Sequence, residues 1–299
     1  MAEEARRTTS RRQLEYQPAF NLLSPDIGQL DEDAFDELWS EDPDEALEIL
    51  AMMSHATDRT LAALARRLAG RLLIDLTTAG PARSGGTGRL VPQRAVPDSS
   101  DIDVDASLDA IHGAMVERRR PSIDDLTTRT WARPETAICL VVDRSGSMDG
   151  ARLATAALAA AACTWRAPGE LAVLAFGDRV LTLKDLHQDQ PPESIVTSVL
   201  RLRGHGTTDI DLALKAARRQ LLASSARRRV VVLLSDGETT TGDDPISAAR
   251  SIEELAIVAP ADEPEHALRL GREAGAGVEL VSGPLDVVSA LNAVLNHRR

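Results

Sequence analysis

The sequence predicts an α/β fold: a doubly wound, mostly parallel six-stranded sheet with one antiparallel edge strand, preceded by a small helical region. Two observations support this prediction. Short apolar runs rich in β-branched residues recur between residues 137 and 281, and amphipathic helical patterns lie between most of them. Nearly continuous apolar strands that alternate with helices indicate a parallel sheet covered by helices on both faces.

Each element of this sheet domain follows from one such run. The expected strands are 137–142, 171–176, 180–183, 230–234, 255–258 and 278–281, and the expected helices are 151–165, 193–202, 209–222, 245–252, 265–274 and 284–295. A short link containing Gly177 and Asp178 joins the second and third strands, which is typical of a hairpin, so the third strand is expected to be the antiparallel edge. In such a Rossmann-like sheet, ligands bind beyond the carboxyl ends of the central strands.

The first part of the chain differs in composition from the second. Residues 1–132 carry 24 acids and 15 bases, whereas residues 133–299 carry 22 acids and 19 bases. Helical spacing of apolar residues predicts two amphipathic helices with acidic outer faces over 30–53 and a third helix over 58–76. The Gly-, Pro-, Ser- and Arg-rich stretch 77–100 is expected to be a loop or linker, followed by a capped helix over 101–117. The predicted organisation is an acidic helical region (1–76), a linker and helix (77–132) and an α/β domain (133–299).

Composition excludes several classes of function. A formal charge of −12 argues against a nucleic-acid binder or a protein of anionic membranes, and 2% aromatic residues argue against base-stacking platforms. The N-terminus has no apolar core and no stretch approaches the ~20 apolar residues of a membrane span, so we expect a cytoplasmic protein. Cys139 and Cys163 lie in apolar runs and are expected to be buried free thiols. Lys184 and Lys215 are the only lysines and neither stands in a G-K-[ST] context, so the chain is not expected to hydrolyse ATP through a P-loop.

Oxygen-bearing side chains follow the expected strands at the edge where ligands bind. Asp143, Ser145 and Ser147 come directly after the first strand, Thr208 precedes the helix at 209, and Asp236 follows the fourth strand. Carboxylates and hydroxyls without a soft ligand favour a hard cation: Mg²⁺ first, with Mn²⁺ and Ca²⁺ as alternatives. The competing interpretation is that these side chains only cap helices and turns.

These residues resemble the metal-ion-dependent adhesion site (MIDAS) of the von Willebrand factor A (VWA) domain. Asp143, Ser145 and Ser147 match its D-x-S-x-S motif, Thr208 its threonine, with Thr207 as the neighbouring alternative, and Asp236 its later aspartate. The resemblance covers about residues 134–299. It implies that the serines and the threonine bind the cation directly and that the aspartates act mostly through water or hydrogen bonds. It also implies an open coordination position for a Glu or Asp carboxylate of a partner protein.

Five further residues stand near the motif and are candidates for contact with the partner or for hydrogen bonds that support the ligands: Arg144, His205, Thr207, Asp209 and Glu238. The Asp-Arg-Ser-Gly-Ser-Met wording resembles bacterial intracellular VWA proteins. Two groups are similar, namely the C-terminal part of the magnesium-chelatase D subunit and the CoxE-like, MoxR-associated proteins that work beside a separate AAA+ ATPase.

The residues before the domain favour the second group, because they are too few and too acidic for an AAA+-like module. We therefore expect a non-catalytic, Mg²⁺-dependent adaptor that works with a MoxR-type AAA+ ATPase in protein remodelling or metal-centre maturation. The alternative is a chelatase D-like regulatory subunit in ATP-driven metal insertion. The acidic helices, expected to lie away from the metal site, are a candidate second contact for a basic face of the ATPase.

Overall fold

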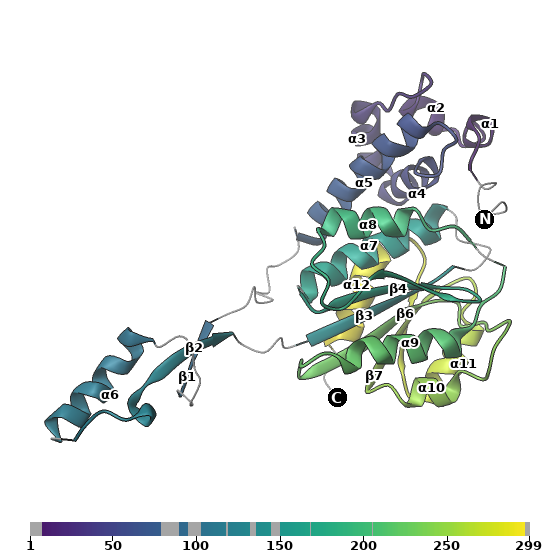
Figure 1. Cartoon of the computed structure of the whole chain (residues 1–299). Helices are drawn as coiled ribbons and strands as arrows, with labels where there is room; N and C mark the ends of the chain where they lie inside the picture. Colours follow the sequence, from purple (N-terminus) through teal and green to yellow (C-terminus); the bar gives the residue numbers. More distant parts are fainter. Residues whose placement is uncertain are drawn as a thin grey trace. The chain divides into compact units, whose positions relative to one another are not determined.

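The computed structural model describes residues 8–78, 90–94, 103–117, 119–131, 136–144, 150–167, 169–204 and 206–296. They belong to two compact units (Figure 1). One unit combines Met1–Gly85 with Thr136–Arg299, and the other is Gly86–Glu135. No helix in the described part of the chain is both long enough and apolar enough to cross a membrane.

The first unit is built on a six-stranded sheet with the order β5-β4-β3-β6-β7-β8. The strands are β3 (Thr136–Asp143), β4 (Leu171–Phe176), β5 (Val180–Lys184), β6 (Arg228–Leu234), β7 (Glu254–Pro260) and β8 (Gly277–Val281). All neighbours are parallel except β4 and β5, so the predicted fold, including its antiparallel edge strand, is confirmed. Asp143 pairs with Phe176 and Val142 with Leu234, so the ends of β3, β4 and β6 lie at one edge.

Helices cover both faces of this sheet. Alternate residues of β3 belong to two different apolar clusters, because successive side chains of a strand point to opposite faces. On one face lie α7 (Gly150–Arg166), α8 (Pro192–Leu200) and α12 (Asp286–Asn296). On the other lie α9 (Ile210–Leu222), α10 (Ile246–Arg250) and α11 (Glu265–Ala274) (Figure 1).

The N-terminal helices form a third layer on α7 and α8. They are α1 (Arg11–Leu14), α2 (Phe20–Leu23), α3 (Glu32–Glu41), α4 (Pro43–Met53) and α5 (Arg59–Thr78), which confirms the predicted helical region. Acidic residues begin the two middle helices: the Asp31 carboxylate accepts the N–H groups of Asp33 and Ala34, and the Asp42 carboxylate accepts that of Glu45. Such caps satisfy free backbone donors and suit the positive end of the helix dipole.

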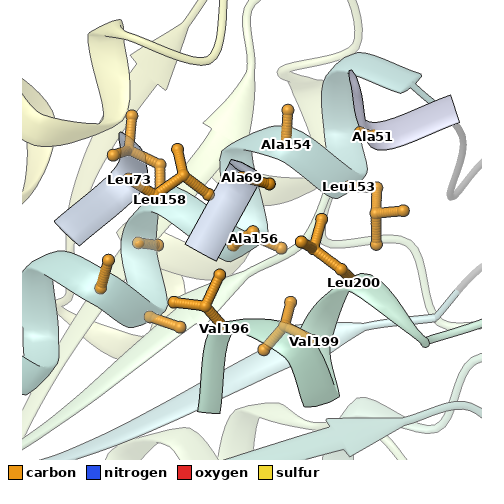
Figure 2. Packing of buried hydrophobic residues seen from close by; sticks show 14 of the residues in the cluster. Ala51, Ala69, Leu73, Leu153, Ala154, Ala156, Leu158, Val196, Val199 and Leu200 are labelled. Atoms are coloured by element: carbon orange, nitrogen blue, oxygen red, sulfur yellow. The ribbon is translucent and has the colours of Figure 1, made fainter. Parts of the chain in front are cut away.

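The packing of this third layer centres on α7, which is buried on nearly every side. Eleven of its residues are buried, and most of them are alanines. Figure 2 shows Ala69 of α5 and Ala51 of α4 beside residues of α7 such as Ala154. Small side chains allow these helices to approach closely, so the N-terminal helices and one face of the sheet share a single apolar core.

The second unit pairs β1 (Leu90–Arg94) antiparallel with β2 (Thr127–Trp131) and adds α6 (Val104–Val116). The backbone N–H of Asp103 donates to the carbonyl of Thr127 (2.7 Å), and that of Thr127 donates to the Ser107 hydroxyl (2.8 Å), so α6 is tied to β2. The expectation of a loop over 77–100 was therefore wrong for residues 90–94. Their strand depends on a partner more than thirty residues later in the chain and shows no local periodicity.

Candidate metal centre

Hydrogen bonds bring three loops together at the carboxyl edge of the sheet. Just beyond β3, the backbone N–H of Arg144 donates to the carbonyl of Phe176 at the end of β4 (2.7 Å). The N–H of Asp209, at the start of α9, donates to the carbonyl of Gly177 (2.9 Å). The segment before α9 is thus held at the end of β4, next to the strand that carries Asp143.

Asp143 is a buried carboxylate held by the loop after β6. Asp143 is only 5% exposed, and the Ser235 hydroxyl donates a hydrogen bond to its Oδ2 atom (2.7 Å). The Ser235 oxygen in turn accepts the N–H of Gly237 (3.0 Å), so one hydroxyl orients both Asp143 and the turn that carries Asp236. The Asp236 Oδ1 atom accepts the N–H of Glu238 (2.9 Å), which fixes that carboxylate in turn.

Thr208 is buried and is positioned through its backbone. Its N–H donates to the Thr240 hydroxyl (2.8 Å), and its carbonyl accepts the N–H groups of Thr240 and Thr241 (3.0 and 3.2 Å). No hydrogen bond within the described residues uses the Thr208 hydroxyl, whereas the neighbouring Thr207 is only half-buried. The structure therefore brings Asp143, Thr208 and Asp236 to one edge, as the sequence motifs predict.

The remaining candidates have other positions. Asp209 caps α9, because its Oδ1 atom accepts the N–H of Leu212 (2.8 Å). Glu238 is exposed, and Arg144 is buried. Three of the candidate residues, Ser145, Ser147 and His205, lie outside the described residues, so their roles stay predictions.

A cavity of about 520 Å³ opens at this edge. Among the described residues that line it, the carboxylates are Glu48, Asp143, Asp236 and Asp262. The single positively charged side chain among these described residues is that of Arg152. The Arg152 guanidinium lies 2.9 Å from Glu263 and 4.0 Å from the Asp236 Oδ2 atom. A cavity with this excess of negative charge favours a cation.

Ser235, Arg152 and Glu48 are among the residues of this cavity that sequence reasoning missed. Ser235 stands inside the quoted Leu-Ser-Asp-Gly-Glu motif, and Arg152 lies in the first turn of the helix after the first motif, so both had a local signal. Glu48 had none. It belongs to α4, one of the acidic helices expected to lie away from the metal site, and the structure corrects that expectation by placing it in the cavity wall with Asp143 and Asp236.

The donor set fits a hard divalent cation. In the described part of the chain no group of three or more His, Cys, Asp and Glu side chains could hold a metal ion. Beside the carboxylates, the buried Thr208 carries a hydroxyl at the same edge of the sheet. Oxygen ligands of this kind suit Mg²⁺ or Mn²⁺ rather than a thiophilic metal.

A six-stranded, doubly wound sheet with aspartates and a threonine at its carboxyl edge has the features of a VWA domain. Residues 81–266 match the family model described as VWA domain containing CoxE-like protein, which is more than half of the chain. The chain belongs to this family.

Several solved structures are similar to part of this chain at low sequence identity. A von Willebrand factor type A protein from Catenulispora acidiphila has 18% identity and a TM-score of 0.42, and the match covers 56% of this chain and 43% of that one. Manganese-loaded TRAP protein from Plasmodium vivax has 17% identity and a TM-score of 0.46, covering 54% of this chain and 74% of that one. BatB from Bacteroides thetaiotaomicron has 11% identity and a TM-score of 0.43, covering 54% and 100%. This chain thus spans less than half of the Catenulispora protein, and no curated protein matches it significantly.

Proposed function

We propose that this protein is a non-catalytic, divalent-cation-dependent adaptor that binds a partner protein through a carboxylate of that partner. The cation is Mg²⁺, and the residues that hold it are Asp143, Ser145, Ser147, Thr208 and Asp236. The observation that carries this proposal is the convergence of buried Asp143, buried Thr208 and Asp236 at one edge of the sheet, beside an acidic cavity.

The roles of the residues follow from their charges. Hydroxyl ligands carry no charge, so they leave a divalent cation only partly neutralised, and the bound cation supplies a positive centre for an incoming carboxylate. Asp143, oriented by Ser235, and Asp236, oriented by the turn after β6, provide fixed negative charge at that centre. Arg152 adds a second positive group in the same cavity wall.

We propose that ATP is hydrolysed by a separate protein. Lys184, one of two lysines, is buried, and its amine donates to the carbonyls of Leu171, Asp185 and Leu186 (2.6, 3.1 and 3.3 Å). It has no capacity left for a phosphate. Membership of the CoxE-like family supports a MoxR-type AAA+ ATPase as the partner, in protein remodelling or metal-centre maturation, over a chelatase-type regulatory role. Two buried free cysteines agree with a reducing cytoplasm.

A pull-down of the MoxR-type ATPase of the same organism tests this function. We expect wild-type protein to retain the ATPase in Mg²⁺ and to release it in EDTA. Asp143→Ala and Ser145→Ala should lose the Mg²⁺-dependent binding. Glu273→Ala, which removes an exposed acid at the end of α11 and outside the acidic helices, is the matched control and should bind as wild type does. Binding that survives both site substitutions and EDTA would falsify the proposal.

A further inference from the structure

The C-terminal ends of α4 and α8 meet where the N-terminal helices join the sheet domain. The hydroxyl of Ser54, at the end of α4, donates to the carbonyl of Leu200, the last residue of α8 (3.2 Å). The Arg66 guanidinium, on α5, donates to the carbonyl of Ser54 (2.5 Å). Arg201 follows Leu200 directly, and Arg203 comes two residues later. Arginines from two distant parts of the chain therefore lie at this junction, and we call Arg66, Arg201 and Arg203 the arginine patch.

The charges of the arginine patch act on one another. Burial, and then the positive charges of Arg201 and Arg203, lower the pKa of Arg66 below its ordinary value. An arginine stays protonated despite such a shift, because its pKa begins far above neutral pH. The junction therefore carries concentrated positive charge, although the chain as a whole has a formal charge of −12.

The arginine patch differs from several other arginines of the same unit, which pair with carboxylates. These pairs are Arg71 with Glu32, Arg152 with Glu263, Arg228 with Glu254 and Arg229 with Glu253. In the part of the chain that the structure describes, neither Arg66 nor Arg201 forms an ion pair with a carboxylate. Arg201 is exposed, so its guanidinium is accessible to an anion from outside.

The ends of the two helices give a competing explanation. The C-terminal end of a helix carries partial negative charge, and a cation placed there is stabilising. Arg66 at the end of α4 and Arg201 at the end of α8 fit this explanation. One arginine at each helix end is sufficient for it, however, and the third increases the repulsion within the patch. An incoming anion would offset that repulsion.

We propose that the arginine patch is a docking surface for an acidic segment of a protein partner, in which several Asp or Glu residues stand close together. A guanidinium group suits this role because it can bind a carboxylate through two parallel hydrogen bonds. A long polyanion such as DNA would also be repelled by the ten acidic residues within 31–48 of the same unit, whereas a short acidic segment can contact the patch alone.

This surface acts without the cation, so the inference goes beyond the proposed function. Arg201 and Arg203 lie in the segment between α8 and α9, which also holds Thr208. A partner that binds the metal centre through one carboxylate can therefore place further acidic residues on the arginine patch. The two contacts can be tested separately, because EDTA removes only the first.

Fluorescence anisotropy of a fluorescein-labelled oligoglutamate peptide tests the docking surface in the full-length chain. EDTA in every sample excludes the metal centre, and low ionic strength limits the screening of charges. We expect saturable binding by wild type. Arg201→Gln should weaken it about fivefold, the upper range for one exposed ion pair, and a double variant with Arg66→Gln should bind more weakly still. Arg272→Gln removes the same charge from the last turn of α11, on the other face of the sheet, and should bind as wild type does.

The outcomes distinguish the explanations. No saturable binding by wild type, or equal affinity of wild type and Arg201→Gln, overturns the docking surface. A lower Tm of Arg201→Gln together with unchanged affinity would mean that this arginine only stabilises the end of α8. A single-stranded oligonucleotide that binds as tightly as the peptide overturns the assignment to an acidic protein segment. None of these results bears on the metal centre, because the cation is absent throughout.

Discussion

His55 follows α4 and joins the N-terminal helices to the sheet domain. Its Nε2 atom lies 2.8 Å from the carbonyl oxygen of Leu200 at the end of α8. Burial, and then the positive charge of Arg203, lower its pKa to about 4, with a smaller contribution from Arg66. The folded protein therefore holds His55 neutral at a pH where the unfolded chain is already protonated.

This shift predicts a loss of stability in acid. The folded pKa of His55 lies below its ordinary value of 6.5, so below pH 6.5 the unfolded state binds more protons than the folded state. The free energy of unfolding should fall as the pH drops from 6.5 to 4, by at most roughly 3 kcal/mol from this group. Denaturant unfolding at pH 7 and pH 4.5 measures the loss. His55→Gln keeps an N–H donor and should lose about 2 kcal/mol less than wild type over this interval.

His112→Gln is the control, because His112 is exposed on α6. Its pH dependence should equal that of wild type. An equal loss of stability in wild type and in His55→Gln would show that another group causes it.

At this same scale, the sequence predicts the site only where the signal is local. Asp143, Thr208 and Asp236 stand in short motifs at the ends of predicted elements, so topology alone places them at one edge. Glu48 reaches that edge through the packing of α4 on α7, which depends on apolar contacts between distant parts of the chain. A short sequence motif carries no information about contacts between distant parts of the chain.

Among the elements, α7 shows why an alanine-rich helix suits its place. It is covered by the sheet, by α4 and α5, and by α8 and α12, so larger side chains have no room (Figure 2). Its sequence alone predicts a helix, and its neighbours explain its composition. The element missed by prediction, β1, is the opposite case, because it contains Pro92 and its strand exists only through pairing with β2.

The packing of α7 predicts the effect of a larger side chain. Ala157 is fully buried in the shared core, so Ala157→Leu should lower the free energy of unfolding by about 1–3 kcal/mol through overpacking. Ala63→Leu makes the same change at an exposed position of α5 and should alter stability by no more than about 0.5 kcal/mol. Denaturant unfolding measures both. Equal stabilities of the two variants would mean that α7 has room on its buried faces.

At the scale of the whole molecule, the shared apolar core includes the N-terminal helices as well as the sheet and the helices that cover it. Residues from Leu14 to Leu295 belong to one apolar cluster. The alternation of strands and helices predicts the mostly parallel sheet and its antiparallel edge strand. It does not reveal that the acidic helices pack on α7 and α8, because an amphipathic helix shows only that it buries one face.

A fragment of residues 133–299 should therefore be less stable than the full chain. Removing the N-terminal helices exposes the apolar residues of α7 and α8 that contact them, and exposed patches of this kind promote aggregation. We expect a lower Tm and stronger light scattering for the fragment. Addition of a separate 1–85 fragment should restore solubility. A fragment as stable and as soluble as the full chain would contradict a shared core.

The order of the two units along the chain bears on how the protein is made. The first unit takes its N-terminal helices from before residue 86 and its sheet from after residue 135, so the second unit is inserted between two halves of one core. During synthesis α3, α4 and α5 leave the ribosome before the surface that covers them has been translated. About sixty further residues must be synthesised after α5 before β3 and α7 can cover these apolar faces. Such long-range pairing is slow, and the exposed apolar faces can aggregate in the meantime. The ten acidic residues within 31–48 give this segment a strong negative charge. Charge repulsion opposes its self-association until the sheet has been synthesised and covers it.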